Sequence, residues 1–176
     1  MAKECLLFNK MSIENKVTES GLITIDLADF YVKGERVVLD IKPLLVEEFL
    51  LREKDFREYI KKTDWSAFKG KLVAITCSND AIIPVWAYML LASALSPYAA
   101  RIVFGDLSDL EKALFMDRLS KLDAEEYRNQ RIVIKGCGDV EVPVQAFVEL
   151  TRKLRPVVKS IMYGEPCSTV PVFKAK

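Results

Sequence analysis

Apolar residues in the second half of the chain fall into short continuous runs that alternate with amphipathic stretches. Four runs are rich in β-branched residues and predict strands, at 71–76, 101–104, 131–135 and 159–163. The intervening stretches have helical spacing and predict helices, at 84–95, 109–121 and 143–154. Strands that are apolar almost throughout and alternate with helices are typical of a parallel sheet. The pattern therefore predicts an α/β fold, with a mostly parallel sheet and helices on both of its faces.

The first part of the chain has a different pattern. Two β-rich runs, LITIDL at 22–27 and RVVLDI at 36–41, are joined by a link that contains Gly34. This arrangement predicts an N-terminal β-hairpin. Pro43 then begins an amphipathic stretch, which predicts a long helix over about 43–63.

Two stretches of the predicted core resemble each other. When Pro84 is aligned with Pro143, 8 of the next 25 positions are identical, and a one-residue deletion upstream brings Cys77 over Cys137. Prolines and leucines recur in any strand-helix-strand unit, but matching cysteines and glycine–acid pairs do not, so we interpret the likeness as a duplication. A single domain over 1–176 is predicted, with these parts: an arm at 1–20, a hairpin plus helix at 21–70, and repeated units at 71–105 and 131–164.

One stretch, residues 81–100, carries no charge over 20 residues, which is nominally enough to cross a bilayer. Pro84 and Pro97, however, leave only about a dozen residues for a helix between them. We therefore expect a helix buried in the protomer or in a homodimer interface, and no membrane contact. Its repeat partner at 143–154 carries Glu149, Arg152 and Lys153, so that helix is expected to have a solvated face.

Charge and composition exclude several classes of function. The chain has 26 basic and 25 acidic residues with no basic stripe, so no nucleic-acid partner is expected. It has no histidine, which excludes Ser-His and Cys-His catalysis and histidine-ligated zinc. Its four cysteines follow no signal peptide, which predicts a cytoplasmic protein with reduced thiols.

Three of the cysteines come directly after predicted strands. Cys77 follows 71–76, Cys137 follows 131–135, and Cys167 follows 159–163. Because the carboxyl ends of parallel strands meet at one edge of a sheet, we expect these thiols to lie together there. Thiolates in such an arrangement can share one metal ion. The sequence therefore predicts a site for zinc or an iron–sulfur cluster, whose ligands are Cys77, Cys137, Cys167 and Asp80.

Other interpretations of these residues remain open. Free cysteines are often buried packing residues, and Asp80 and Asp139 are well placed to cap the helices that follow them. Cys167 lies in the polar stretch GEPCSTVPVFK, where Ser168 and Thr169 can stabilise a thiolate, so it is also a candidate nucleophile or persulfide acceptor. Three readings therefore compete: a metal-binding protein that uses Asp80, Asp139, Glu165 or solvent as fourth ligand, a thiol enzyme or sulfur carrier, and an interaction module with structural cysteines.

Several motifs together are similar to those of a bacterial family of unknown function. They are SGLITIDL, REYIKKTDW, CSNDAIIPVWAYML, IVIKGCG and, most specific of all, GEPCSTVPVFK. The likeness covers about residues 12–176, and Cys77, Cys137 and Cys167 match the cysteines of the family's motifs. Genes of this family often neighbour those that assemble iron–sulfur clusters. The resemblance therefore implies iron–sulfur assembly proteins as partners, and it implies no particular reaction.

Overall fold

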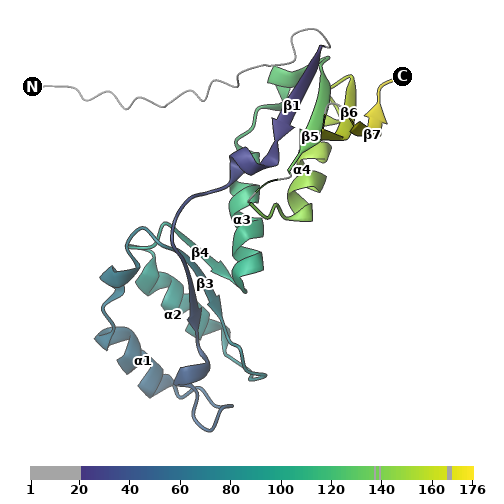
Figure 1. Cartoon of the computed structure of the whole chain (residues 1–176). Coiled ribbons are helices and arrows are strands. Elements are labelled where there is room, and N and C mark those ends of the chain that lie inside the picture. The colour runs from purple at the N-terminus through teal and green to yellow at the C-terminus, as the bar shows by residue number, and fades with distance from the viewer. Residues whose placement is uncertain (1–20, 137, 139, 166–167) are drawn as a thin grey trace, which may run out of the picture.

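The strands in the described part of the chain form two separate sheets (Figure 1). A computed structural model of the chain describes residues 21–136, 138, 140–165 and 168–176. The three-stranded sheet has the order β2-β3-β4, and both of its strand pairs are parallel. The four-stranded sheet has the order β1-β5-β6-β7, in which only the last pair is antiparallel. The strands are β1 Leu22–Asp26, β2 Arg36–Asp40, β3 Leu72–Thr76, β4 Arg101–Phe104, β5 Arg131–Lys135, β6 Ser160–Glu165 and β7 Ser168–Lys174.

Among the described residues, four α-helices cover these sheets. They are α1 Glu53–Lys62, α2 Val85–Leu95, α3 Leu107–Ser120 and α4 Val144–Leu154. Helices α1 and α2 pack on one face of the three-stranded sheet, where Phe56 and Leu91 contact a core that includes Val73. Helix α4 packs on the four-stranded sheet. Short 3-10 turns connect the elements, at Leu27–Phe30, Lys42–Leu44, Trp65–Phe68 and Ala124–Tyr127.

Helix α3 belongs to both halves of the molecule. A capping box formed by Asp106 and Asp109 starts the helix. Its first half places Leu110 and Leu114 against the second face of the three-stranded sheet. Its second half places Phe115, with Leu119, in the core of the four-stranded sheet. The helix is therefore the packed connection between the two sheets, as the ribbon drawing also shows (Figure 1).

The predicted fold class is confirmed, with differences in how the strands pair. The fold is α/β, the strand pairs are mostly parallel, and the three-stranded sheet has helices on both faces. The single sheet that we expected is instead two sheets. The strands β1 and β2 follow each other as expected but do not pair as a hairpin, because β1 pairs with β5 and β2 with β3. The prediction of one domain over 1–176 stays a prediction.

The helix expected over about 43–63 is shorter than predicted. Pro43 lies in a 3-10 turn, and Glu47 and Glu48 have φ angles of 51° and 67°. Residues other than glycine rarely adopt this left-handed backbone conformation, and it does not occur within a right-handed α-helix. The α-helical part therefore begins only at Glu53.

The strand registers agree with the predicted internal duplication and give it a more regular spacing than the sequence alignment implied. Leu72 of β3 pairs with Arg101 of β4, and Arg131 of β5 pairs with Ser160 of β6, so the counterparts are 59 residues apart in both strands. Pro84 and Pro143, also 59 apart, are the N-caps of α2 and α4, with ψ angles of 138° and 137°.

This constant spacing leaves no room for the deletion that we placed before the prolines. The residue that occupies the place of Cys77 in the second unit is Gly136, and the match with Cys137 is wrong by one position.

The duplication reaches beyond the two predicted segments. The amide of Gly70 donates to Tyr98 O and that of Asn129 to Val157 O, both at 2.9 Å and again 59 residues apart. Phe56 of α1 and Phe115 of α3, also 59 residues apart, are each buried in the core of one sheet. Each sheet therefore contains one complete unit. In the sequence, the unit of the three-stranded sheet is inserted after β1, and it separates β1 from the other strands of the four-stranded sheet.

Candidate functional site

The carboxyl edge of the three-stranded sheet is organised around Asp40. Its carboxylate accepts hydrogen bonds from the Ser78 amide (3.0 Å), the Ser78 hydroxyl (2.5 Å) and the Lys42 amide (2.9 Å). Burial acts to raise the pKa of Asp40, but the hydrogen bonds from Ser78 and Lys42 outweigh it, so the pKa lies below its ordinary value. Asp40 therefore ties the loop after β3 to the end of β2.

Asp40 should make stability depend on pH. A carboxyl group whose pKa is lowered by folding stabilises the protein above its unfolded pKa, and this contribution disappears as the pH falls through the folded value. We expect Asp40→Asn to reduce the free energy of unfolding at pH 7 and to flatten its decline between about pH 5 and about pH 2. Urea unfolding at a series of pH values measures both effects. Asp80→Asn, an exposed carboxylate in the same loop, is the control, and equal curves for the two variants would contradict the assignment.

Cys77 and Asp80 lie in that same loop. The Cys77 thiol is partly buried against the core of the three-stranded sheet and donates a hydrogen bond to Asn79 O at 3.5 Å. The side-chain amide of Asn79 donates in turn to Glu48 O. Asp80 is exposed. The surroundings of Cys77 are those of a packing residue with one weak hydrogen bond.

The carboxyl edge of the four-stranded sheet carries a group of charges. Lys135 Nζ lies 3.0 Å from Asp26 Oδ2 and 4.0 Å from Glu165 Oε1. These residues end β5, β1 and β6, so three neighbouring strands supply one residue each. The hydrogen bond to Asp26 raises the pKa of Lys135, with a smaller contribution from the charge of Glu165. This edge therefore holds one lysine between two carboxylates.

The structure separates one predicted cysteine position from the other two. Cys137 and Cys167 lie outside the described residues, as does Asp139. Cys137 comes two residues after Lys135, and Cys167 lies in sequence between Glu165 and Ser168, which are paired across β6 and β7. Both flank neighbouring strands of the four-stranded sheet. Cys77 and Asp80 follow β3, a strand of the other sheet, so the described strands do not form the single shared edge on which we based the grouping.

Among the residues that the structure describes, no three or more cysteine, aspartate or glutamate side chains are grouped closely enough to hold a metal ion. The predicted site of Cys77, Cys137, Cys167 and Asp80 stays a prediction, since two of its thiols are not among those residues.

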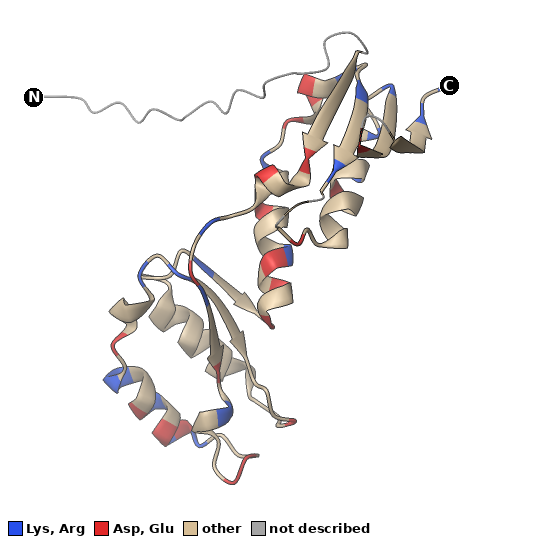
Figure 2. Ribbon diagram, viewed as in Figure 1, with Lys and Arg blue, Asp and Glu red and all other residues tan. Residues whose placement is uncertain are grey.

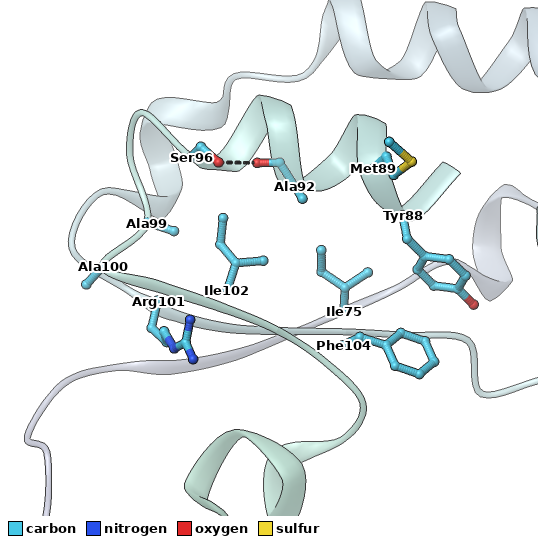
Figure 3. A pocket seen from close by; sticks show the side chains of 10 residues that line it. All are labelled: Ile75, Tyr88, Met89, Ala92, Ser96, Ala99, Ala100, Arg101, Ile102 and Phe104. Atoms are coloured by element: carbon cyan, nitrogen blue, oxygen red, sulfur yellow. Dashed lines mark hydrogen bonds between the residues drawn. The ribbon is translucent and has the colours of Figure 1, made fainter. Parts of the chain in front are cut away.

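A groove that we did not predict lies between α2 and β4 (Figure 3). Its volume is about 530 Å³, and most of its lining is apolar. Tyr88 of α2 and Phe104 of β4 meet edge to face at one end, with ring centroids 5.0 Å apart. Burial raises the pKa of Tyr88 above its ordinary value. The lining residues are Ile75, Tyr88, Met89, Ala92, Ser96, Ala99, Ala100, Arg101, Ile102 and Phe104.

Helix α2 explains why the sequence did not reveal this groove. Its lack of charge predicted burial in the protomer or in an interface. In the structure Ala87, Leu91 and Leu95 are fully buried, whereas Val85 is 73% and Met89 66% exposed. Burial on all sides within the protomer is therefore wrong. The solvated face predicted for α4 is confirmed by Arg152, whose side chain is 70% exposed. In the described part of the chain, no helix is both long and apolar enough to cross a membrane.

Comparison with known proteins gives one match. The family model described as a protein of unknown function (DUF2480) matches residues 11–175. No curated protein and no solved structure matches the chain. The match covers the strands and helices of both sheets, and it begins within the N-terminal arm. The chain therefore belongs to the DUF2480 family of proteins of unknown function.

Proposed function

We propose that the protein binds a thiophilic metal, as a zinc ion or an iron–sulfur species, through Cys137 and Cys167 at the carboxyl edge of the four-stranded sheet. The observation that carries the proposal is the pairing of β5 with β6 in parallel register. Neighbouring strands lie about 4.8 Å apart, and Zn–S bonds of about 2.3 Å require sulfurs at a similar or shorter separation. Cysteines that follow two such strands can therefore reach one ion.

One of the charges at this edge, that of Lys135, favours a thiolate. A thiol beside a cation loses its proton more readily, and Asp26 raises the pKa of Lys135 further above its ordinary value. Glu165 is half exposed and only 4.0 Å from Lys135, so its carboxylate remains available as an oxygen ligand. The donor set of two thiols and one carboxylate suits zinc or iron. Such a site needs reduced thiols, and the proposal includes a cytoplasmic location and iron–sulfur assembly proteins as partners.

Metal analysis of the full chain, purified without a tag or a chelator, tests this proposal. We expect about one equivalent of zinc or iron in the wild type, and its loss in Cys137→Ser and in Cys167→Ser. Cys77→Ser is the matched control, because Cys77 lies beside the other sheet, and it should retain the metal. Far-UV circular dichroism checks that each variant folds. A wild type without metal, or equal loss of metal in Cys77→Ser, would refute the proposal.

The same lysine favours a second candidate, a thiol enzyme or sulfur carrier that uses Cys167. In that case the Cys167 thiol should react with iodoacetamide at a pH well below the ordinary pKa of about 8.5, whether or not metal is bound. Peptide mapping after limited alkylation measures the reactivity of each cysteine separately. If Cys167 reacts no faster than Cys77 at pH 6.5, this candidate is refuted.

A further inference from the structure

We propose that two copies of this chain associate through the free edge of β4, which joins their three-stranded sheets into one sheet of six strands. Within the residues that the structure describes, β4 pairs with β3 alone. Its counterpart in the duplicated unit, β6, pairs with β5 on one side and with the antiparallel strand β7 on the other. An unpaired strand edge offers backbone donors and acceptors to a further strand.

The duplicated unit shows what such an edge accommodates. The counterparts of Tyr88 and Phe104 are Phe147 and Tyr163, which also meet edge to face, at 5.8 Å. They line a groove of about 330 Å³ between α4 and β6, and Val172 of β7 closes part of it. In the four-stranded sheet, an antiparallel strand therefore pairs with the strand that borders this groove and covers part of it. The larger groove beside β4 has no such strand in the described part of the chain.

The exposed side of α2 is uncharged and carries two large apolar side chains, Val85 and Met89. In α4, the residues Glu149, Arg152 and Lys153 face solvent or bind other groups of the protein. At the corresponding places α2 has Leu90, Ser93 and Ala94, of which Leu90 and Ala94 pack against the core of their own chain and Ser93 is exposed. Figure 2 shows α2 without a charged residue, beside the highly charged α1. Because Val85 and Met89 on this uncharged helix are largely exposed, an apolar surface extends from the helix to the edge of β4.

A second copy is the occupant that fits this surface best. A two-fold axis through the edge makes the two β4 strands antiparallel, which is the direction that β7 adopts on β6. Both copies then contribute the same apolar residues, which are self-complementary. Arg101, the charged residue of the groove, is already paired with Asp117 of its own chain at 2.9 Å, so two copies meet without unpaired like charges. A charged peptide would find no counter-charge in this groove.

Analytical ultracentrifugation of the full chain tests the association, with two matched variants. Met89→Glu places a charge at the centre of the proposed interface. Val148→Glu places the same charge at the corresponding exposed position of α4. We expect a wild-type dimer, a dissociation constant raised about thirtyfold or more by Met89→Glu, and no change with Val148→Glu. A wild type that is monomeric at every protein concentration measured, or equal weakening of the dimer by both variants, overturns the proposal.

Two further measurements separate this interface from other contacts and from misfolding. Val85→Lys and Val144→Lys form a second matched pair, of which only Val85→Lys should weaken the dimer. Hydrogen exchange should show that amides of β4, residues 101–104, become more protected as the protein concentration rises and the dimer forms. A dimer whose β4 amides exchange at the same rate as those of the monomer would show that the strands do not pair, and would overturn the proposal.

Discussion

Replacing Phe115 by alanine should lower the free energy of unfolding by about 3–5 kcal/mol. Phe115 is 1% exposed and lies in the core of the four-stranded sheet, with Leu119, Ile132 and Leu150 around it. Removing its ring takes away apolar contacts and leaves a cavity that the rigid strands β1 and β5 cannot close. Urea unfolding followed by far-UV circular dichroism measures the loss.

The tryptophans provide a second readout of the same variant. Trp65 and Trp86 both belong to the core region of the three-stranded sheet, whereas Phe115 lies in the core of the four-stranded sheet. Because α3 belongs to both cores, we expect tryptophan fluorescence and circular dichroism to report the same shift in midpoint. Phe49→Ala, at a side chain that is 68% exposed, should change stability by less than about 0.5 kcal/mol. A loss of less than about 1 kcal/mol in Phe115→Ala would show that this residue is not part of the core.

The sequence was informative about individual elements because each depends on local pattern. β4 and β5 match their predicted ranges, and α2 and α4 begin one residue after the predicted position, with their prolines as N-caps. The strand β7 was not predicted, because Pro171 interrupts its apolar alternation. In the structure Pro171 lies where the register of β7 on β6 shifts, on an edge strand that tolerates a missing amide donor.

The division of the strands between two sheets could not be predicted from pattern. β3 and β5 are both short, apolar and buried on their two faces, and nothing in either sequence selects its neighbours. Because one unit is inserted into the other, β1 pairs with β5, which lies more than 100 residues later in the sequence. Such a pairing depends on the packing of the whole chain, and the adjacent strand β2 was the simpler expectation.

The candidate site was affected by the same error. Grouping Cys77 with Cys137 required that their strands belong to one sheet. Aligning the two identical cysteines, with a one-residue deletion, supported that grouping. The strand registers give a constant spacing instead, in which Gly136 takes the place of Cys77. Lys135 was missed because it ends an apolar strand, and its value to a thiol site follows only from its position between Asp26 and Glu165.

Leu91→Ala should lower the free energy of unfolding by about 2–5 kcal/mol, although α2 lies at the surface of the protomer. Leu91 is fully buried in the core of the three-stranded sheet, where it packs with Phe56, Val73 and Leu95. Its counterpart Leu150 is equally buried in the other core, so Leu150→Ala should cost a similar amount. Urea unfolding at protein concentrations low enough to favour the monomer measures both.

Met89→Ala distinguishes the two faces of the same helix. Met89 lies two residues before Leu91 and is 66% exposed, so its truncation should change the stability of the monomer by less than about 0.5 kcal/mol. If Leu91→Ala costs no more than this, α2 does not pack as described. If both truncations cost more than about 2 kcal/mol in the monomer, the exposed face of α2 is covered within the chain. Only a large loss at Leu91 with a small one at Met89 agrees with a helix that has one face in the core and an apolar face left for a partner.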